Sequence, residues 1–178
     1  LKDWCNKKSI HIVETSDILT HSTHTAADIQ ALIDTYDISI TPRDYQIAAF
    51  KFALEYDRGM ILSPTASGKS LIIYMLCRHY MNMIDNNILI IVPTTSLVEQ
   101  LYKDFKDYGF DVDKNVSRKY HGYDIDEDKR IVISTWQSLY KMPKKFFEDY
   151  GAVIGDEAHL FKAVSLTKIM TKLTDCKY

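Results

Sequence analysis

The chain has 178 residues, of which 46% are hydrophobic and 26% are charged, which is the composition of an ordinary globular domain with a sizeable core. A net charge of -2 excludes binding to nucleic acid through bulk positive charge, so any contact with DNA or RNA has to be local. Cys5, Cys77 and Cys176 are too few and too far apart for a disulfide framework or a zinc site. No apolar run could span a membrane and no signal peptide is present, so we expect free thiols and a cytoplasmic setting.

Residues 1–38 are expected to form a small accessory segment. Ser9–Glu14 is a short β-like run, and a helix is predicted from Thr25. Thr25 is a candidate N-cap because Asp28 follows it at the spacing of a capping box.

The helix that follows is expected to begin with Thr41 as its N-cap and Pro42 at its first position, and to end near Arg58–Gly59. It is either a plain amphipathic helix or the part of a nucleotide site that contacts the base. A glutamine amide offers a donor and an acceptor together, which suits the edge of adenine, so Gln46 is a candidate adenine contact. Arg43 is a second candidate for the same role.

A phosphate loop follows an apolar run. Residues 63–70 match G-x-x-x-x-G-K-[ST] at every defined position except the first, where Ser63 replaces glycine. Gly68 lets the backbone approach an anion, Lys69 reaches the β- and γ-phosphates, and the Ser70 hydroxyl ligates Mg²⁺. The other expected ATP-binding residues of the loop are Pro64, Thr65, Ala66 and Ser67.

Strands and helices alternate after the loop. Strands are predicted at 88–92, 115–120, 130–135 and 152–154. Helices are predicted from the N-cap Ser96 to 108–109, at 143–150 and at 164–173. Ile88–Val92 is apolar on every side, as in a strand covered on both faces. This alternation predicts an α/β fold, a mainly parallel sheet with helices on both faces.

Two acids, Asp156 and Glu157, follow the last predicted strand. Ligands of an open parallel sheet bind beyond the carboxyl ends of its strands, so these acids and the phosphate loop are expected to converge. Asp156 would hold Mg²⁺ through its water shell, and Glu157 would orient or deprotonate the attacking water. Nucleotide kinases do not need this second acid, so the pattern favours hydrolysis of a nucleoside triphosphate.

Four stretches in order resemble motifs of the superfamily 2 DExH-box (DEAH-box) helicases. Ser63–Ser70, Pro93–Gln100, Ser134–Ser138 and Asp156–His159 resemble motifs I, Ia, Ib and II, and Pro42–Gln46 resembles the Q motif. The resemblance implies a RecA-like P-loop NTPase lobe that uses ATP and Mg²⁺. Within the superfamily the chain is especially similar to the recombination and repair helicases of phages.

The resemblance also implies the contacts with nucleic acid. The residues implied are Pro93, Thr94, Thr95, Thr135, Trp136 and Gln137. Hydroxyls and backbone N–H groups would hold the phosphates of one strand, which explains the absence of strong basic charge. Trp136 would stack on a base or pack in the core, and we favour the core. His159 would couple the nucleotide site to the nucleic-acid side.

Two departures from the family pattern bear on the extent of the motor. Ser63 replaces the first glycine of motif I. The second departure is that the second RecA-like lobe, with its arginine finger, is not in this sequence, and Thr171–Thr174, about where motif III would be expected, does not match it. We therefore expect residues 39–178 to be the first, ATP-binding lobe of a longer protein, with weak turnover when isolated.

The function expected from the resemblance is an ATP-dependent DNA helicase or translocase. Its substrates would be branched or recombination intermediates in phage replication and repair, in the host cytoplasm, with RNA as an alternative. Two other interpretations stay open: a nucleotide-dependent nucleic-acid-binding module with little turnover, and the motor lobe of a restriction-type translocase.

Two further features have plain explanations. His21 and His24 could bind a metal, but no other histidine or cysteine lies near them and a solvated loop is the better interpretation. The lysines at 141, 144 and 145 could contact phosphates or form a solvated cluster.

Overall fold

The computed structural model describes residues 11–12, 25–56, 59–64, 66–120, 124–126, 128–157, 160 and 163–173. It contains two compact units, Leu1–Arg78 and His79–Tyr178. The division falls inside helix α4 (Lys69–Met83), which begins at the phosphate loop.

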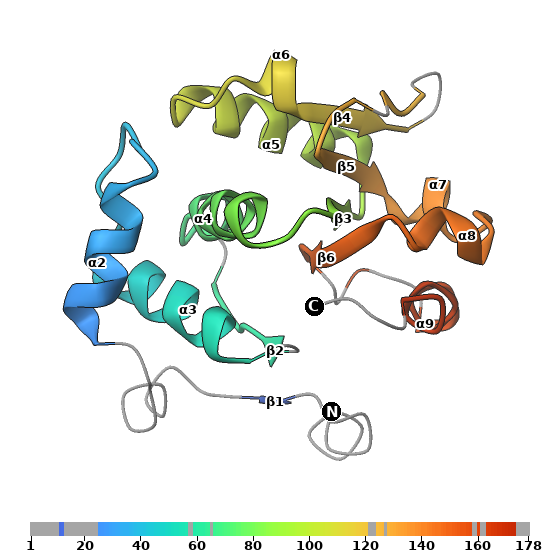
Figure 1. Cartoon of the computed structure of the whole chain (residues 1–178). Coiled ribbons are helices and arrows are strands. Elements are labelled where there is room, and N and C mark those ends of the chain that lie inside the picture. Colours follow the sequence, from blue (N-terminus) through green and yellow to red (C-terminus); the bar gives the residue numbers. More distant parts are fainter. Residues whose placement is uncertain are drawn as a thin grey trace. The chain divides into compact units, whose positions relative to one another are not determined.

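The first unit contains helices α2 (Ala26–Asp34) and α3 (Asp44–Glu55) and two short parallel strands (Figure 1). The strands are β1 (His11–Ile12) and β2 (Gly59–Met60). The capping box predicted at the start of α2 is confirmed: the Asp28 N–H donates to Thr25 Oγ1 at 3.2 Å, and the Thr25 N–H donates to Asp28 Oδ2 at 2.9 Å.

The predicted start and end of α3 were wrong. The N-cap is Arg43 and not Thr41, so the predicted first-turn proline precedes the helix. The reason is that the Arg43 N–H donates to Gln46 Oε1 at 2.8 Å, which is the reciprocal half of a capping box and fixes the first turn. The helix stops at Glu55, earlier than predicted, because Tyr56 adopts the extended backbone that leads toward β2.

Fully buried aromatic side chains form the core of this unit. The rings of Tyr36 and Phe50 meet edge to face at 6.3 Å. Arg78, near the middle of α4, donates to the Tyr36 carbonyl at 2.6 Å and to the Tyr74 hydroxyl at 2.8 Å. These contacts tie α4 to the end of α2, so the helix that carries the phosphate loop is fixed within the unit.

The second unit is built on a four-stranded parallel sheet in the order β4-β5-β3-β6. The strands are β3 (Asn87–Val92), β4 (Val116–Lys119), β5 (Ile131–Thr135) and β6 (Tyr150–Gly155). Residues 88–92 of the central strand β3 are all buried, as the apolar run predicted. The α/β class and the parallel sheet are therefore confirmed.

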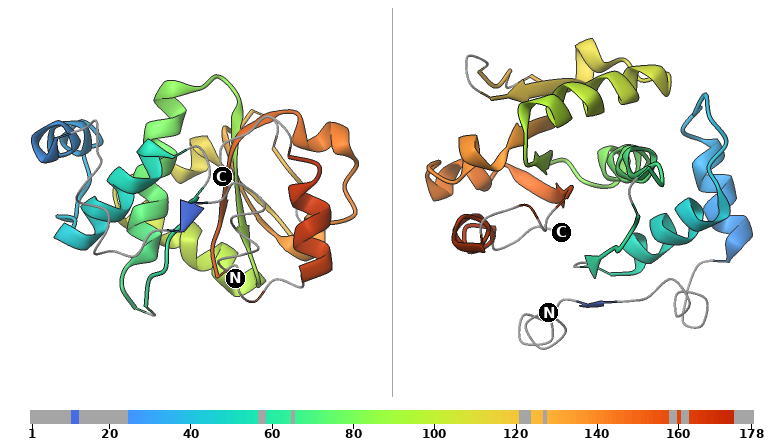
Figure 2. Two further views of the ribbon diagram at one scale, coloured as in Figure 1. Left: turned by 90° about the horizontal axis from the view of Figure 1, so that it is seen from below. Right: turned by 180° about the vertical axis from the view of Figure 1, so that it is seen from behind.

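Helices cover both faces of this sheet. They are α5 (Thr95–Asp107), α6 (Val112–Asn115), α7 (Trp136–Leu139), α8 (Lys144–Phe147) and α9 (Ala163–Met170). Figures 1 and 2 show α5 on one side of the sheet and α7, α8 and α9 on the other. The core under α7–α9 contains Leu89, Ile91, Val132, Leu139, Phe147, Tyr150, Val153, Ile169 and Leu173. None of the helices in the described part of the chain is long and apolar enough to cross a membrane.

Two details of this unit differ from prediction. The N-cap of α5 is Thr94 and not Ser96, because Thr94 has extended backbone and its Oγ1 accepts from the Leu97 N–H at 3.3 Å. Tyr150 was predicted at the end of a helix but opens β6, where it pairs with Asn87. The predicted end of α5 at Tyr108 is confirmed.

Candidate functional site

The phosphate loop turns through two residues with left-handed backbone. Ala66 has φ +61° and Gly68 has φ +74°, and α4 begins at the next residue, Lys69. Lys69 Nζ donates to the Pro64 carbonyl at 3.4 Å, so the ammonium group folds back over its own loop. Thr65 lies outside the described residues. The loop and helix N-terminus thus have the local form of an anion-binding site.

Gln46 supports this loop from α3. Its side chain is 5% exposed, and both N–H groups of Nε2 are used: they donate to the Ser67 carbonyl at 3.2 Å and to the Gly68 carbonyl at 3.1 Å. A Cβ added to Gly68 would lie 2.5 Å from Nε2. Gln46 was predicted to contact adenine, whereas the structure places its amide donors on the loop. Position 68 must be glycine because a side chain there would collide with this amide.

Tyr45 also holds the loop, and the sequence analysis did not identify it. Its hydroxyl donates to the Ser67 carbonyl at 2.7 Å and accepts from Arg43 Nη1 at 3.1 Å. Two neighbouring side chains of α3, Tyr45 and Gln46, therefore bind the same carbonyl. The only signal in the sequence was the position of an aromatic residue inside the Q-like motif.

The unusual Ser63 has a partner in the loop. Its hydroxyl lies 2.5 Å from the hydroxyl of Ser67, a short O–H···O contact that joins the two ends of the turn. Ala66, between them, has positive φ, which costs an L-residue with a Cβ about 1 kcal/mol. The serine pair and the contacts from α3 offset this strain.

A cavity of about 330 Å³ lies beside the loop. It is lined by Tyr45, Ala49, Leu62, Ser63, Ala66 and Ile72, among others. Its apolar walls and its volume are in the usual range for a small-molecule site.

In the second unit, Asp156 and Glu157 follow β6 directly. The Asp156 N–H donates to the Ile91 carbonyl at 2.9 Å, which continues the ladder between β6 and β3 by one residue. Asp156 is 9% exposed, and its Oδ1 accepts from the Glu157 N–H at 2.9 Å. Glu157 has φ +50°, so the chain turns sharply after the sheet. The rest of the motif, Ala158 and His159, lies outside the described residues.

Each of the two units contains an oxygen ligand of a kind that suits Mg²⁺. This ion prefers hard oxygen ligands and keeps several waters, so one carboxylate and one hydroxyl, with phosphate oxygens, suffice. Asp156 offers the carboxylate and Ser70, half-buried in the first turn of α4, offers the hydroxyl. Among the described residues no group of three or more His, Cys, Asp or Glu could hold a metal. His21 and His24 lie outside those residues.

Two segments predicted to contact nucleic acid are joined by a hydrogen bond. Gln137 Nε2 donates to the Pro93 carbonyl at 3.1 Å, which connects the segments that follow the neighbouring strands β3 and β5. Pro93 is buried, whereas Thr94 and Thr95 are exposed at the start of α5. Exposed hydroxyls at a helix N-terminus are suitable for phosphate oxygens.

Thr135 and Trp136 are less accessible. Thr135 is 4% exposed, and its hydroxyl lies 3.0 Å from that of Ser138. A contact between Thr135 and a nucleic-acid strand would therefore use the backbone of Thr135. Trp136 is partly buried against the core under α7–α9, with its ring 6.2 Å from that of Tyr140. The favoured core placement of Trp136 is confirmed. The lysines at 141, 144 and 145 are exposed.

Known proteins are similar to this chain in sequence. The model of the family described as "Type III restriction enzyme, res subunit" matches residues 39–178. The chain is 36% identical over 143 residues to the ATP-dependent DNA helicase uvsW of Enterobacteria phage T4, covering 78% of this chain and 28% of the relative. It is 30% identical over 117 residues to the DNA 3'-5' translocase XPB2 of Sulfurisphaera tokodaii, covering 66% and 25%. The chain thus spans about a quarter of the length of these curated relatives.

Solved structures share the fold. The crystal structure of the UvsW helicase from bacteriophage T4 superposes with a TM-score of 0.81 at 30% identity, over 98% of this chain and 65% of the other. A nuclease-deletion mutant of the Type ISP restriction-modification enzyme LlaGI, in complex with a DNA substrate mimic, superposes with a TM-score of 0.56 at 19% identity. That match covers 78% of this chain and 17% of the other, and it shows the fold alone.

Proposed function

This chain belongs to the family described as "Type III restriction enzyme, res subunit" and is an N-terminal RecA-like lobe of the superfamily 2 helicases, and from this premise we propose that it is the ATP-binding lobe of an ATP-dependent DNA helicase or translocase. The observation that carries the proposal is the phosphate loop at the start of α4, supported by Gln46 and followed by Lys69 and Ser70.

Each chemical role is proposed for one side chain. Lys69 leaves the Pro64 carbonyl and binds the β- and γ-phosphates. Ser70 and Asp156 hold Mg²⁺, which when bound neutralises charge on the phosphate oxygens. Glu157 orients or deprotonates the water that attacks the γ-phosphate. His159 couples this chemistry to the nucleic acid.

The base is proposed to lie in the cavity of about 330 Å³ beside the loop. Arg43 and Gln46 are the residues that we propose to contact the adenine base. The Nε2 donors of Gln46 bind the loop, and its Oε1, which accepts from the Arg43 N–H, keeps a second lone pair for the amino group of adenine.

The nucleic acid is proposed to run past the segments that follow β3 and β5. Thr94 and Thr95 contribute exposed hydroxyls, and Pro93, Thr135 and Trp136 contribute backbone groups. Gln137 holds the two segments together. Such contacts bind the backbone of one strand and do not read bases. Branched or recombination DNA in phage replication and repair is the substrate that we propose, in the cytoplasm of the host.

We propose that residues 39–178 form the lobe and that residues 1–38 are accessory to it. A second RecA-like lobe is the proposed partner, since charge stabilisation by an arginine from that lobe is what one lobe lacks. The chain by itself then binds nucleotide with little turnover.

The family's description favours a second candidate, the motor lobe of a restriction-type translocase. This candidate shares the ATP chemistry and differs in what the rest of the protein does. A nuclease motif in the sequence that continues this chain would distinguish it from a repair helicase.

The test is steady-state ATP hydrolysis by the protein that contains both lobes, with and without single-stranded and branched DNA. We expect strong stimulation by DNA, and we expect Glu157→Gln to bind ATP but lose turnover by about 100-fold or more, because a water-positioning group is removed. Lys69→Ala should abolish turnover. Turnover that ignores DNA, or that survives in Glu157→Gln, would contradict the proposal.

A further inference from the structure

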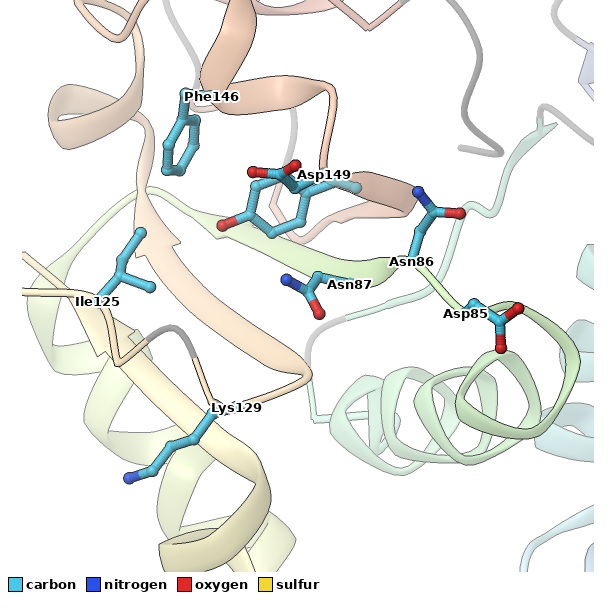
Figure 3. A pocket seen from close by; sticks show the side chains of 8 residues that line it. Asp85, Asn86, Asn87, Ile125, Lys129, Phe146 and Asp149 are labelled. Atoms are coloured by element: carbon cyan, nitrogen blue, oxygen red, sulfur yellow. The ribbon is translucent and has the colours of Figure 1, made fainter.

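A second cavity, of about 550 Å³, lies at the amino ends of β3 and β6 (Figure 3). Asp85 and Asn86 line it from the turn before β3, Asn87 lines it from the first residue of β3, and Asp149 and Tyr150 line it from the start of β6. The cavity lies at the amino ends of these parallel strands, whereas Asp156 follows the carboxyl end of β6. The length of β6, about 20 Å, separates the two.

Polar side chains of this cavity have no hydrogen-bond partner in the part of the chain that the structure describes. They are the carboxylates of Asp85 and Asp149, the amides of Asn86 and Asn87 and the hydroxyl of Tyr150. Tyr150 is only 6% exposed, and burial and the Asp149 carboxylate raise the pKa of its phenol, which therefore stays neutral. Tyr150 lines the cavity and its hydroxyl is not one of the fully enclosed atoms that lack a partner, so this neutral hydroxyl is open to the cavity and available to a ligand.

The cavity is rigidly built. Arg130 Nη2 donates to the Ile84 carbonyl at 2.6 Å and to the Asn86 carbonyl at 3.0 Å, which fixes the turn before β3. The register of β6 against β3 shifts at Gly151, and a Cβ there would lie 2.9 Å from the Cβ of Asn86. Such bulges re-aim the side chains beside them. The polar groups are therefore pre-organised and do not depend on a mobile loop.

The charge of the cavity is negative. Asp85 and Asp149 are both exposed at its rim. Lys129, which also lines it, has its ammonium 3.3 Å from Asp126 Oδ2 and is thus already neutralised. Arg130, whose guanidinium holds the turn before β3, offsets one of the two carboxylates, so the groups around the cavity keep one net negative charge, which repels phosphates and attracts a cation.

The walls of the cavity are apolar. Phe146 and Ile125 line it, and the ring of Phe146 lies 5.3 Å from that of Tyr150. Figure 3 shows Phe146 and Ile125 on one side and Asn86 and Asp85 on the other. Apolar walls with acids at the rim fit an alkyl stem that ends in a charged group.

We propose that this cavity is a docking site for a basic side chain, an arginine or lysine, of a protein partner. A polyamine is also positively charged but offers only donors, whereas the asparagine amides and the Tyr150 hydroxyl also need an acceptor. The peptide carbonyls that flank a basic side chain supply one. Occupation leaves the opposite edge of the sheet, with Asp156 and the segments after β3 and β5, open for nucleotide and nucleic acid.

The test is an NMR titration of the ¹⁵N-labelled chain with acetyl-Gly-Arg-Gly-amide. We expect saturable shifts at residues 85–87, 149 and 150, and about tenfold weaker binding of the citrulline analogue, which lacks the charge. Shifts scattered over the acidic surface, or equal binding of the two peptides, would overturn the site. If spermidine bound as tightly as the arginine peptide, the proposal that the ligand is a protein side chain would be overturned.

Variants separate the site from general charge. The double variant Asp85→Asn with Asp149→Asn should weaken the peptide at least about tenfold, and Tyr150→Phe should weaken it by a smaller factor. Asp107→Asn removes a negative charge at the exposed end of α5, away from the cavity, and should not change the affinity for the peptide. Both cavity aspartates are exposed, so replacing them with asparagine should leave the fold intact, and thermal melting of the double variant checks this. Unchanged affinity in the double variant overturns the proposal.

Discussion

The phosphate loop and the acidic pair are positioned by different means. In the first unit, the loop carbonyls of Ser67 and Gly68 are held by side chains of α3, more than twenty residues earlier in the chain. In the second unit, Asp156 is held by a backbone hydrogen bond that continues the sheet. The loop therefore depends on particular side chains, whereas the acid depends on strand register, which most side-chain substitutions leave intact.

The largest effect is expected at Gly68, where loop and support meet. In Gly68→Ala the new Cβ would lie 2.5 Å from Gln46 Nε2 at a backbone φ of +74°. Left-handed strain and two lost hydrogen bonds cost about 3 kcal/mol, or about 100-fold in affinity for Mg²⁺ and a fluorescent ATP analogue. Gly59→Ala is the matched control, since its Cβ would meet only the Phe52 ring. Affinity within about twofold of wild type would contradict the support role.

Gln46→Ala should have the next largest effect. It removes both donors from the loop carbonyls and the acceptor of the Arg43 N–H. Buried carbonyls without partners cost about 1–3 kcal/mol, so affinity for the same analogue should fall roughly tenfold. Gln46→Glu should bind the analogue no more tightly than Gln46→Ala does, because a carboxylate cannot donate a hydrogen bond to the loop carbonyls. If Gln46→Glu bound normally, the amide would act elsewhere than on the loop.

Ala66→Gly should leave the stability of the loop almost unchanged. Glycine tolerates φ +61° without strain, so the substitution removes about 1 kcal/mol of cost, against a loss of chain entropy on folding of similar size. The net effect on the melting temperature should therefore be small, and hydrogen exchange at Ser67 and Gly68 should stay within about twofold of wild type. Faster exchange would show that the alanine conformation is not strained.

Asp156→Asn should leave stability almost unchanged. The contact with Ile91 uses backbone atoms, and asparagine keeps an oxygen that can accept from the Glu157 N–H. Chemical denaturation should give a free energy of unfolding within about 0.5 kcal/mol of wild type, while Mg²⁺-dependent turnover is lost. A large loss of stability would mean that the carboxylate, and not the strand, organises this turn.

Sequence reasoning identified the parallel sheet because the apolar run of β3 and the regular alternation of elements are local signals. It found the start of α2 but failed at the starts of α3 and α5: residues 94–96 are Thr-Thr-Ser, any of which can cap, and the geometry after Pro93 selects Thr94. It also missed the loop support, because Tyr45 and Gln46 reach carbonyls twenty-one or twenty-two residues away, and no local pattern encodes such a contact. The residue types of the chemistry were visible, but the contacts that hold them were not.

The most direct test of the account is a calorimetric titration of the chain with Mg²⁺ and a non-hydrolysable ATP analogue, for wild type and Lys69→Ala. The account predicts one saturable site in wild type and at least about tenfold weaker binding in the variant, because the ammonium proposed to bind the phosphates is lost. Equal affinity in the two proteins, or no binding to wild type, would contradict the assignment of this loop as the nucleotide site.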